Sequence, residues 1–339
     1  IVLGLPVAFA LLLSAIGLML HMDLFSADIL AQALVNGVDS FPLLAIPFFI
    51  IAGEVMSAGG LSKRIVTLAI SLVGHKQGGL GYVVILTSVL LAGLSGSAVA
   101  DAAALVSILY PMMKKANYPN SHSVGLLASG GIIAPVIPPS LPLIIMGVAG
   151  NISIAKLFIG GIVPGLMMGM ALALTWYFLV RKEPLEIGKK TTPAERRTAL
   201  KDGIWALLLP IIIIGGIRFG VFTPTEAAVV AAVYAIVVSI FVYRELTLIK
   251  FVDVLISSAH STAMVMFLVG SAMVASWLIT VAQLPQDLAA LLGPLVEHPK
   301  LLMASIMVLV FLVGMVMDLS PTILILVPLF MPIVIIAGI

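Results

Sequence analysis

The sequence predicts an all-α polytopic membrane protein built from two related halves, and three observations support this prediction. First, 62% of the 339 residues are hydrophobic and 9% are charged, whereas soluble domains have roughly 45–50% and 25%. Second, runs such as Lys156–Val180 and Ser261–Val281 can cross a hydrocarbon core that needs about 20 apolar residues. They are rich in helix formers and lack the alternation of a barrel, and lipid tolerates only helices or closed barrels. Third, the chain repeats itself at a fixed displacement.

The internal repeat has a displacement of 217 residues. The identical pairs are Gly53/Gly270, Met56/Met273, Ala58/Ala275, Leu61/Leu278, Asp101/Asp318, Ile108/Ile325, Leu109/Leu326 and Pro111/Pro328. The aspartates are the most informative pair, because a carboxylate inside an apolar stretch is costly in a bilayer and usually marks a functional site. Two halves with intramembrane polar residues at matching places are typical of secondary transporters.

The charges orient the predicted spans. Seven of the 17 Lys and Arg residues lie in one hydrophilic loop at 181–201, which the positive-inside rule places in the cytoplasm. Lys156–Val180 then connects this loop to an outer turn at Gly150–Ser153. The proline-broken stretch Ser123–Gly150 returns from that turn to an inner turn at Lys114–Lys115.

Two short helices precede this inner turn. Tyr82–Leu94 and Ala98–Met113 are flanked by Lys76 and Lys114, so they form a re-entrant hairpin that enters and leaves from the cytoplasm. Phe41–Ala58 would then run inward.

An amphipathic segment lies between that span and the hairpin. Lys63 and Arg64 are expected to point away from its apolar stripe, so the segment should lie on the membrane surface. The stripe consists of Leu61, Ile65, Leu68 and Leu72.

The second half is expected to run in the opposite direction. Its elements are Gly203–Ile217 outward, Glu226–Val242 back to Arg244, a surface segment with Leu248, Phe251, Val252 and Leu255, the exit span Ser261–Val281, and a second hairpin of Leu301–Gly314 and Leu319–Pro332. Because this hairpin is entered from outside, the charge pattern implies inverted repeats, each with a re-entrant hairpin and a broken helix. Pro135–Pro142 displaced by 217 falls near 352–359, so we expect the gene to continue into a second break.

Polar chemistry concentrates at two places in the first half. Gly93–Asp101 is rich in small residues and serines, which favours a hairpin tip with exposed backbone. Such irregular backbone survives at membrane depth only inside protein or beside a wet cavity. Ala134–Pro142 contains four prolines, and a proline in a helix removes a donor and orphans the carbonyl four residues back. The carbonyls predicted to be freed are those of Gly131, Ala134, Pro135 and Pro138.

Freed carbonyls and serine hydroxyls suit sodium, while helix N-termini facing the gap suit an anion. Each motif also has a structural interpretation. The small residues could serve close helix packing, and the prolines could form a simple kink. Asp101 could stabilise the positive end of its helix, and Thr223-Pro224-Thr225-Glu226 has the spacing of a capping box.

Three motifs resemble those of the large membrane subunit of tripartite ATP-independent periplasmic (TRAP) transporters, with the sialic acid type as one candidate. They are the runs Gly93–Ala104, Pro135–Pro142 and Phe222–Ala228. The resemblance implies an elevator-type, sodium-coupled symporter for organic anions such as sialic acid or C4-dicarboxylates. It also implies a bacterial inner membrane location, a small membrane subunit and a periplasmic substrate-binding protein.

The resemblance further implies the site residues. A first sodium would be held by Ser95, Ser97, Val136 and Pro138, with Gly96 and Ala134 beside them, and a second near Gly314 and Asp318; the substrate would contact Asp101, Pro139 and Ser140. The implied domains are a first scaffold with interfacial helix at 1–81, a transport hairpin and broken helix at 82–150, scaffold spans with the loop 181–202 at 151–260, and the second-repeat span and hairpin at 261–339.

Two other function classes remain open. An intramembrane aspartyl protease would use Asp101 and Asp318 as a proton-sharing pair, but no Gly-x-Gly-Asp surrounds either residue. A passive ion channel could use similar polar tips. The chain contains no cysteine, so disulfides and thiolate metal sites are excluded, and we expect neither an enzyme nor a nucleic-acid partner.

Overall fold

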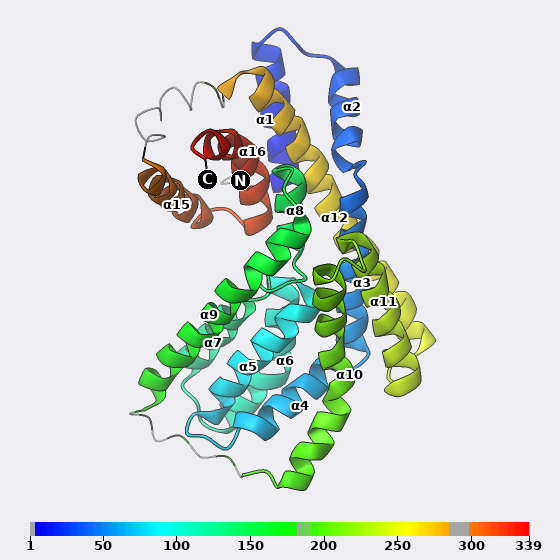
Figure 1. The fold of residues 1–339 in the computed structure, drawn as a ribbon, viewed down its shortest axis with the longest axis vertical. Coiled ribbons are helices and arrows are strands. Elements are labelled where there is room, and N and C mark those ends of the chain that lie inside the picture. Colours follow the sequence, from blue (N-terminus) through cyan, green and yellow to red (C-terminus); the bar gives the residue numbers. More distant parts are fainter. Residues whose placement is uncertain are drawn as a thin grey trace. The chain divides into compact units, whose positions relative to one another are not determined.

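The computed structural model describes residues 4–338 except 182, 184, 186–187, 189, 285 and 287–297, together with all side chains in that range apart from those of 94 and 95. Every regular element within the described residues is helical (Figure 1). In chain order the elements are α1 (Val7–His21), α2 (Ala27–Val38), the 3-10 turn η1 (Phe41–Leu44), α3 (Ala45–Ala58), α4 (Leu61–Val73), α5 (Gly79–Ser95), α6 (Ala98–Lys115), α7 (Asn120–Gly131), α8 (Leu141–Ala149), α9 (Ile154–Val180), α10 (Pro193–Arg218), α11 (Pro224–Val237), the π-helical η2 (Val238–Val242), α12 (Leu248–Val281), α15 (Pro299–Gly314) and α16 (Leu319–Ile336).

Six helical segments within the described residues are long and apolar enough to cross a membrane. They are Phe41–Ala58, Ile154–Val180, Pro193–Arg218, Pro224–Val242, Leu248–Val281 and Leu319–Ile336. Length and composition therefore confirm an all-helical chain of the multi-pass membrane type.

The chain divides into two compact units. Unit 1 comprises Ile1–Leu43, Ile144–Ser153 and Ser261–Ile339, and unit 2 comprises Leu44–Leu143 and Ile154–His260. The functional domains expected from the sequence concern which parts move together, which these boundaries do not test, so they stay predictions.

Unit 2 is organised around two tight helix pairs, α3 with α11 and α4 with α10. The α3–α11 pair is close because α11 presents only small side chains to it. Those buried alanines are Ala227, Ala228, Ala231, Ala232 and Ala235.

The stripe on α4 is covered by protein. Leu61, Ile65 and Leu68 are almost fully buried, whereas Leu72 is 44% exposed, and α4 packs on α10 and α5. The apolar stripe therefore packs against neighbouring helices, which offer it as apolar a partner as lipid would. The expectation that the segment lies on the membrane surface stays a prediction. Arg64 forms an ion pair, since its Nη1 lies 2.8 Å from Oε1 of Glu245.

The base of the first hairpin lies at the end of unit 2 that carries the basic loop. The Trp176 indole N–H donates to the carbonyl of Gly78 at 2.9 Å, and the Tyr118 ring stacks on Trp176 with 6.2 Å between centroids. Trp176 is near the end of α9, directly before the basic loop. Hairpin base and basic loop therefore share one side, as the charge pattern predicts; Lys182 and Lys189 of that loop lie outside the described residues.

The helix α12 is continuous over 34 residues. The prediction of a separate surface segment at Leu248–Leu255 before the span Ser261–Val281 was therefore wrong. Polar residues at Ser257, Ser258 and His260 interrupt the apolar pattern without interrupting the backbone hydrogen bonds.

Unit 1 contains the second hairpin. The helices α15 and α16 pack against each other, with Leu302, Phe330 and Ile333 as their buried core. Their bounds agree with the two helices expected at Leu301–Gly314 and Leu319–Pro332. A second cluster joins α1, α2 and the C-terminal part of α12 through Met19, Leu34 and Val274, among others.

Candidate functional site

The tip of the first hairpin turns in two residues. α5 ends at Ser95, Gly96 adopts a left-handed conformation with φ +62°, and Ser97 caps α6. The Ser97 hydroxyl accepts a hydrogen bond from the Ala100 amide at 3.4 Å. Glycine supplies the positive φ without the steric cost that other residues meet there. The predicted tip is confirmed, while the Ser95 side chain lies outside the described part.

The predicted helix break is also present. α7 ends at Gly131 and α8 begins at Leu141, and the nine residues between them form turns that include a cis peptide bond between Pro138 and Pro139. Proline explains the interruption, since it removes amide donors and its ring obstructs a continuous helix.

Only part of the predicted set of freed carbonyls is free. The carbonyl of Gly131 accepts from the Ala134 amide at 3.3 Å, and that of Pro135 accepts from the Ser140 hydroxyl, so the prediction was wrong for both. Within the described residues no hydrogen bond reaches the carbonyls of Ala134 and Pro138. The break thus exposes fewer oxygens than proline spacing alone suggests, because a serine and a turn amide use two of them.

Tip and break face each other inside unit 2. A Cβ built on Gly96 would lie 2.5 Å from the carbonyl oxygen of Pro139 and 3.0 Å from Cα of Ser140. A Cβ on Gly93 would lie 3.7 Å from the carbonyl oxygen of Pro138. Two motifs about 40 positions apart in the sequence therefore meet backbone to backbone, and glycine at 96 permits the contact.

A buried apolar cluster holds this arrangement. Ala92, near the tip, packs with Ile133, Ala134 and Ile137 of the break, and side chains of α9 cover them. The carbonyl oxygen of Val136 lies against Gly161 of α9. Among the predicted sodium ligands, Val136 therefore faces α9 and not the tip.

Three glycines of α9 that the sequence analysis did not single out also belong to this contact. A Cβ on Gly161 would overlap the Val136 carbonyl, one on Gly165 would overlap Ile137, and one on Gly169 would lie 2.7 Å from Cγ2 of Val89. Their regular spacing of four residues is visible in the sequence and is the signal that predicts a close helix contact.

Ser140 has a local structural task. It is fully buried, its hydroxyl donates to Pro135, and it accepts from the Leu143 amide at 3.4 Å near the start of α8. Its role, and that of Pro139, in substrate binding stays a prediction.

The two aspartates occupy different positions. Asp101 is 4% exposed and lies four residues after the cap Ser97, in the first turn of α6. Asp318 is exposed and is itself the cap of α16, where its carbonyl accepts from the Thr322 hydroxyl at 2.8 Å. A four-residue difference exceeds the usual uncertainty of helix ends. The prediction of equivalent points was therefore wrong, and by helix position Asp318 matches Ser97.

The remaining predicted residues of the second site lie in the other unit. Gly314 ends α15 and Asp318 begins α16, so the two flank the turn of the second hairpin. Within the described residues no group of three or more His, Cys, Asp or Glu side chains could hold a metal ion.

Two acidic residues of the spans, Glu226 and Glu54, each have a hydrogen-bond partner. Thr223 and Glu226 form a capping box in which the Thr223 amide donates to Oε2 of Glu226 at 2.8 Å, which confirms the structural interpretation. Glu54, which sequence reasoning missed, accepts from the Ser257 hydroxyl at 3.3 Å. A lone acidic residue in an apolar span is the signal that could have found it.

Comparison with known proteins decides the family. The family model described as "Tripartite ATP-independent periplasmic transporter, DctM component" matches residues 1–339. The chain belongs to this family. The resemblance seen in the three motifs is thereby confirmed, and the aspartyl protease alternative is not favoured.

Named relatives cover nearly the whole chain. The 2,3-diketo-L-gulonate TRAP transporter large permease protein of Escherichia coli is 57% identical over 339 residues, which are 100% of this chain and 80% of that protein. The sialic acid TRAP large permease of Vibrio cholerae is 39% identical over 336 residues (99% and 79%). The C4-dicarboxylate TRAP large permease of Pseudomonas aeruginosa is 38% identical over 319 residues (93% and 75%).

Proposed function

We propose that the chain is the membrane permease of a tripartite system that takes up an organic anion by sodium-coupled symport. The observation that supports this most directly is the contact between the hairpin tip at Gly96 and the break at Pro138–Ser140. It creates irregular backbone within a helical membrane protein, the arrangement by which secondary transporters build ion and substrate sites.

The proposed first sodium site uses oxygens at this contact. Sodium is a hard cation that prefers carbonyl and hydroxyl oxygens, and unwound backbone supplies them in transporters. The candidates are the carbonyls of Ala134 and Pro138, the Gly96 backbone, and the hydroxyls of Ser95 and Ser97. The proposed second sodium site lies near Gly314 and Asp318. There the turn of the second hairpin would supply oxygens as the first hairpin tip does.

The proposed substrate is a sugar-acid carboxylate. The relative at 57% identity is named for 2,3-diketo-L-gulonate, whereas relatives at 38–39% are named for sialic acid and C4-dicarboxylates. All of these carry a carboxylate. The N-terminal ends of α6 and α8, at Ala98 and Leu141, lie beside the tip and break, and such ends attract anions.

We further propose an elevator movement, with one revision of the moving body. The sequence assigns Lys156–Val180 to the static scaffold, but α9 packs through three glycines onto α5 and the break. Such contacts would have to separate if α9 stayed behind. The revised moving body therefore contains α5, α6, α7 and α9. As in the original expectation, the second hairpin moves with it. In support of two related halves, each contains a helical hairpin, α5–α6 (Gly79–Lys115) in the first and α15–α16 (Pro299–Ile336) in the second, displaced by 220 residues at their starts and 221 at their ends.

The moving body is tested by two cross-links in the cysteine-free chain. A disulfide between Val89→Cys and Gly169→Cys joins two moving helices and should leave uptake intact, whereas one between Gly93→Cys and Pro210→Cys joins α5 to α10 and should stop it. A Cβ on Gly93 would lie 3.1 Å from Cβ of Pro210, close to disulfide distances. Each protein is its own control after reduction. Uptake that survives the second cross-link would contradict the elevator.

Sodium coupling is tested in proteoliposomes that contain the full-length permease and its small membrane subunit, with the periplasmic binding protein outside. Uptake of labelled 2,3-diketo-L-gulonate should require an inward sodium gradient and stop when the gradient is collapsed. Uptake that persists without the gradient would indicate a passive channel, and cleavage of membrane peptides without uptake would indicate a protease.

A further inference from the structure

The two legs of the α10–α11 hairpin are short for membrane spans. On α10, Gly203–Ile217 is a stretch of 15 uncharged residues between Asp202 and Arg218, which is roughly 22 Å of helix. The return through α11 and η2 has 17 uncharged residues between Glu226 and Arg244, or roughly 26 Å. By contrast, α9 in the same unit has 27 residues. Each leg is therefore roughly 4–8 Å shorter than a hydrocarbon core about 30 Å thick.

Aromatic residues mark the end of the hairpin that lies toward the basic loop. The Tyr243 hydroxyl, directly after η2, donates to the carbonyl of Asp202 at 2.6 Å, and the Tyr234 hydroxyl donates to the carbonyl of Trp205 at 2.7 Å. Tryptophan and tyrosine are enriched at membrane–water interfaces. Both legs therefore meet the inner interface near Asp202 and Tyr243, and the missing length falls at the outer turn.

Charged side chains close the outer end of both legs. Arg218 is the last residue of α10, Glu226 lies in the first turn of α11, and both are exposed. The Glu226 carboxylate is held by its capping box, in which it accepts from the amide and the hydroxyl of Thr223 at 2.8 and 2.9 Å. It cannot move toward the membrane surface without breaking these bonds, and a carboxylate in hydrocarbon is costly. The hairpin therefore cannot simply sink into a bilayer of ordinary thickness.

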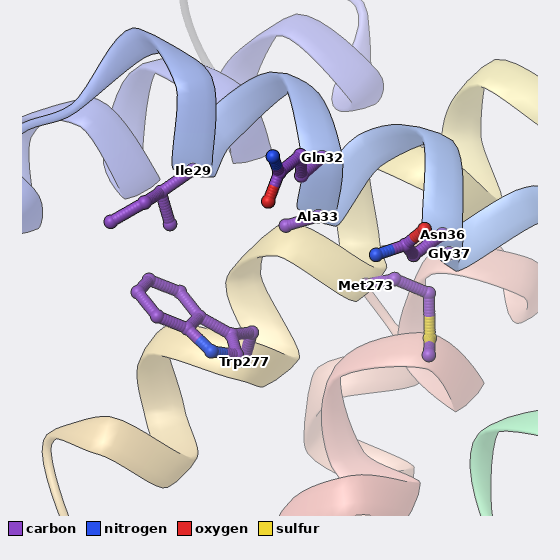
Figure 2. Close-up of a pocket in the computed structure, with 7 residues that line it drawn as sticks. All are labelled: Ile29, Gln32, Ala33, Asn36, Gly37, Met273 and Trp277. Atoms are coloured by element: carbon purple, nitrogen blue, oxygen red, sulfur yellow. The ribbon is translucent and has the colours of Figure 1, made fainter.

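The turn between the legs is apolar. Residues 219–222 are Phe, Gly, Val and Phe, and Phe219 is 82% exposed and Val221 65% exposed. The exposed groove between α2 and the C-terminal part of α12 differs, because the carboxamides of Gln32 and Asn36 line it and suit water (Figure 2). Exposed apolar side chains beside charged ones are instead typical of segments at the boundary between headgroups and acyl chains.

The backbone of the turn is suited to this boundary, because its amide donors are already paired. The amides of residues 219–222 donate to carbonyls in the last turn of α10 at 2.8–3.2 Å, and the next amide, that of Thr223, donates to Glu226. Lipid tolerates a turn only when such groups are satisfied within the protein. The turn can therefore contact lipid without leaving these donors unsatisfied.

We propose that the outer leaflet is thinned beside the α10–α11 hairpin, with headgroups at the level of Arg218 and Glu226 and with Phe219 and Val221 inserted between lipids as anchors. Thinning is one of the ways in which a bilayer accommodates a span shorter than its core, at a cost that rises with the mismatch. Arg218 has a long side chain that can reach outward, whereas Glu226 in its capping box cannot. This lipid contact lies on α10, which the proposed elevator keeps static, and it depends on neither substrate nor sodium.

The first test varies the thickness of the bilayer and measures the thermal midpoint of unfolding. The full-length permease with its small subunit is reconstituted in phosphatidylcholines whose acyl chains have about 14 to about 22 carbons. The midpoint should be highest in the short chains and fall by several degrees as the chains lengthen, because the mismatch grows. Glu226→Gln keeps the capping box, which accepts glutamine, and removes the charge, so it should flatten this dependence on chain length.

Glu195→Gln is the matched control. Thr192 and Glu195 form the same kind of capping box at the start of α10, in the charged segment that precedes Gly203. This variant should keep the full dependence on chain length. A midpoint of the unmodified protein that does not fall with chain length, or the same dependence in both variants, would overturn the inference.

A second measurement locates the anchors directly. A nitroxide label on Phe219→Cys reports collisions with oxygen, which concentrates in lipid, and with a nickel chelate, which stays in water. The ratio of oxygen to nickel collisions should be several times higher than for a label on Asn151→Cys, which replaces another exposed side chain in a predicted outer turn. Equal ratios would place the turn in water, and few collisions with either reagent would mean that protein covers it; each result would overturn the inference.

Discussion

Replacing Gly96 by alanine tests the contact between hairpin tip and helix break. The φ of +62° costs an L-residue roughly 1–2 kcal/mol. The new Cβ would also lie 2.5 Å from the Pro139 carbonyl oxygen and 3.0 Å from Cα of Ser140. Both are backbone atoms, so tip and break must separate, and overpacking of this kind costs about 1–3 kcal/mol. The two costs together are expected to destabilise the folded protein by roughly 2–5 kcal/mol. The strain would be concentrated at the proposed sodium site.

Gly220→Ala is the matched control. Gly220 also has a positive φ, +72°, in a turn between two helices, but nothing lies within 4 Å of its added Cβ. It carries the conformational cost without the clash. The difference between the two variants therefore isolates the contact of the tip with the break.

The assay is sodium-dependent uptake in proteoliposomes, with the thermal midpoint of unfolding measured with and without sodium. Gly96→Ala should raise the sodium concentration for half-maximal uptake at least tenfold and reduce the stabilisation by sodium, whereas Gly220→Ala should lower the midpoint only. Equal sodium activation in both variants would refute the assignment of the ion site to this contact.

Three further predictions concern other parts of the chain. Ser97→Ala should weaken sodium activation, whereas Thr192→Ala, which removes an equivalent N-cap from α10 at a similar cost of about 1 kcal/mol, should not; equal sodium curves would contradict a role for Ser97. Single cysteines at 151 and 189 should react with an impermeant thiol reagent in intact cells only at 151, and the opposite result would reverse the topology. Arg64→Ala should lower the free energy of unfolding by roughly 1–2 kcal/mol, because Arg64 pairs with Glu245 and stacks 3.7 Å from the Tyr243 ring centroid; an unchanged midpoint would contradict this.

The hairpins and the break were predictable because local chemistry decides them. Glycine and serine at 93–97 and four prolines at 135–142 act on the backbone within a few residues, whatever the rest of the chain does. Apolar length likewise decides which segments can cross a bilayer.

The environment of apolar stripes was not predictable from periodicity. The stripe of α4 could face lipid or α10 with the same sequence, since both environments are apolar. The charge pattern did not distinguish them, because Arg64 reaches Glu245, 181 positions away. Only tertiary contacts separate an interfacial helix from a packed one.

The hydrogen bonds of the break were not predictable from proline spacing either. Proline spacing says which amides are missing, but not which other donors approach the orphaned carbonyls. Here Ser140 reaches back to Pro135, so one carbonyl is used for the start of α8. The prediction that Asp101 and Asp318 occupy equivalent positions was wrong for a related reason. Scattered identities at one displacement do not determine the residue at which a helix begins.

The proposed sodium site consists largely of backbone oxygens, so side-chain substitution alone would be a weak probe of it. Glycine removes side chains between the two backbones, and proline removes amide donors from the facing segment. Within the described residues no hydrogen bond reaches the carbonyl oxygens of Ala134 and Pro138, and that of Pro138 lies 3.7 Å from the position of a Cβ on Gly93. A site made from such oxygens depends on backbone position more than on side-chain identity. An alanine scan would leave Ala134 untouched and would leave the backbone oxygen of Pro138 in place. A methyl group added at Gly96 would lie 2.5 Å from the carbonyl oxygen of Pro139. It would act on the backbone position itself, and for that reason it is the sharper experiment.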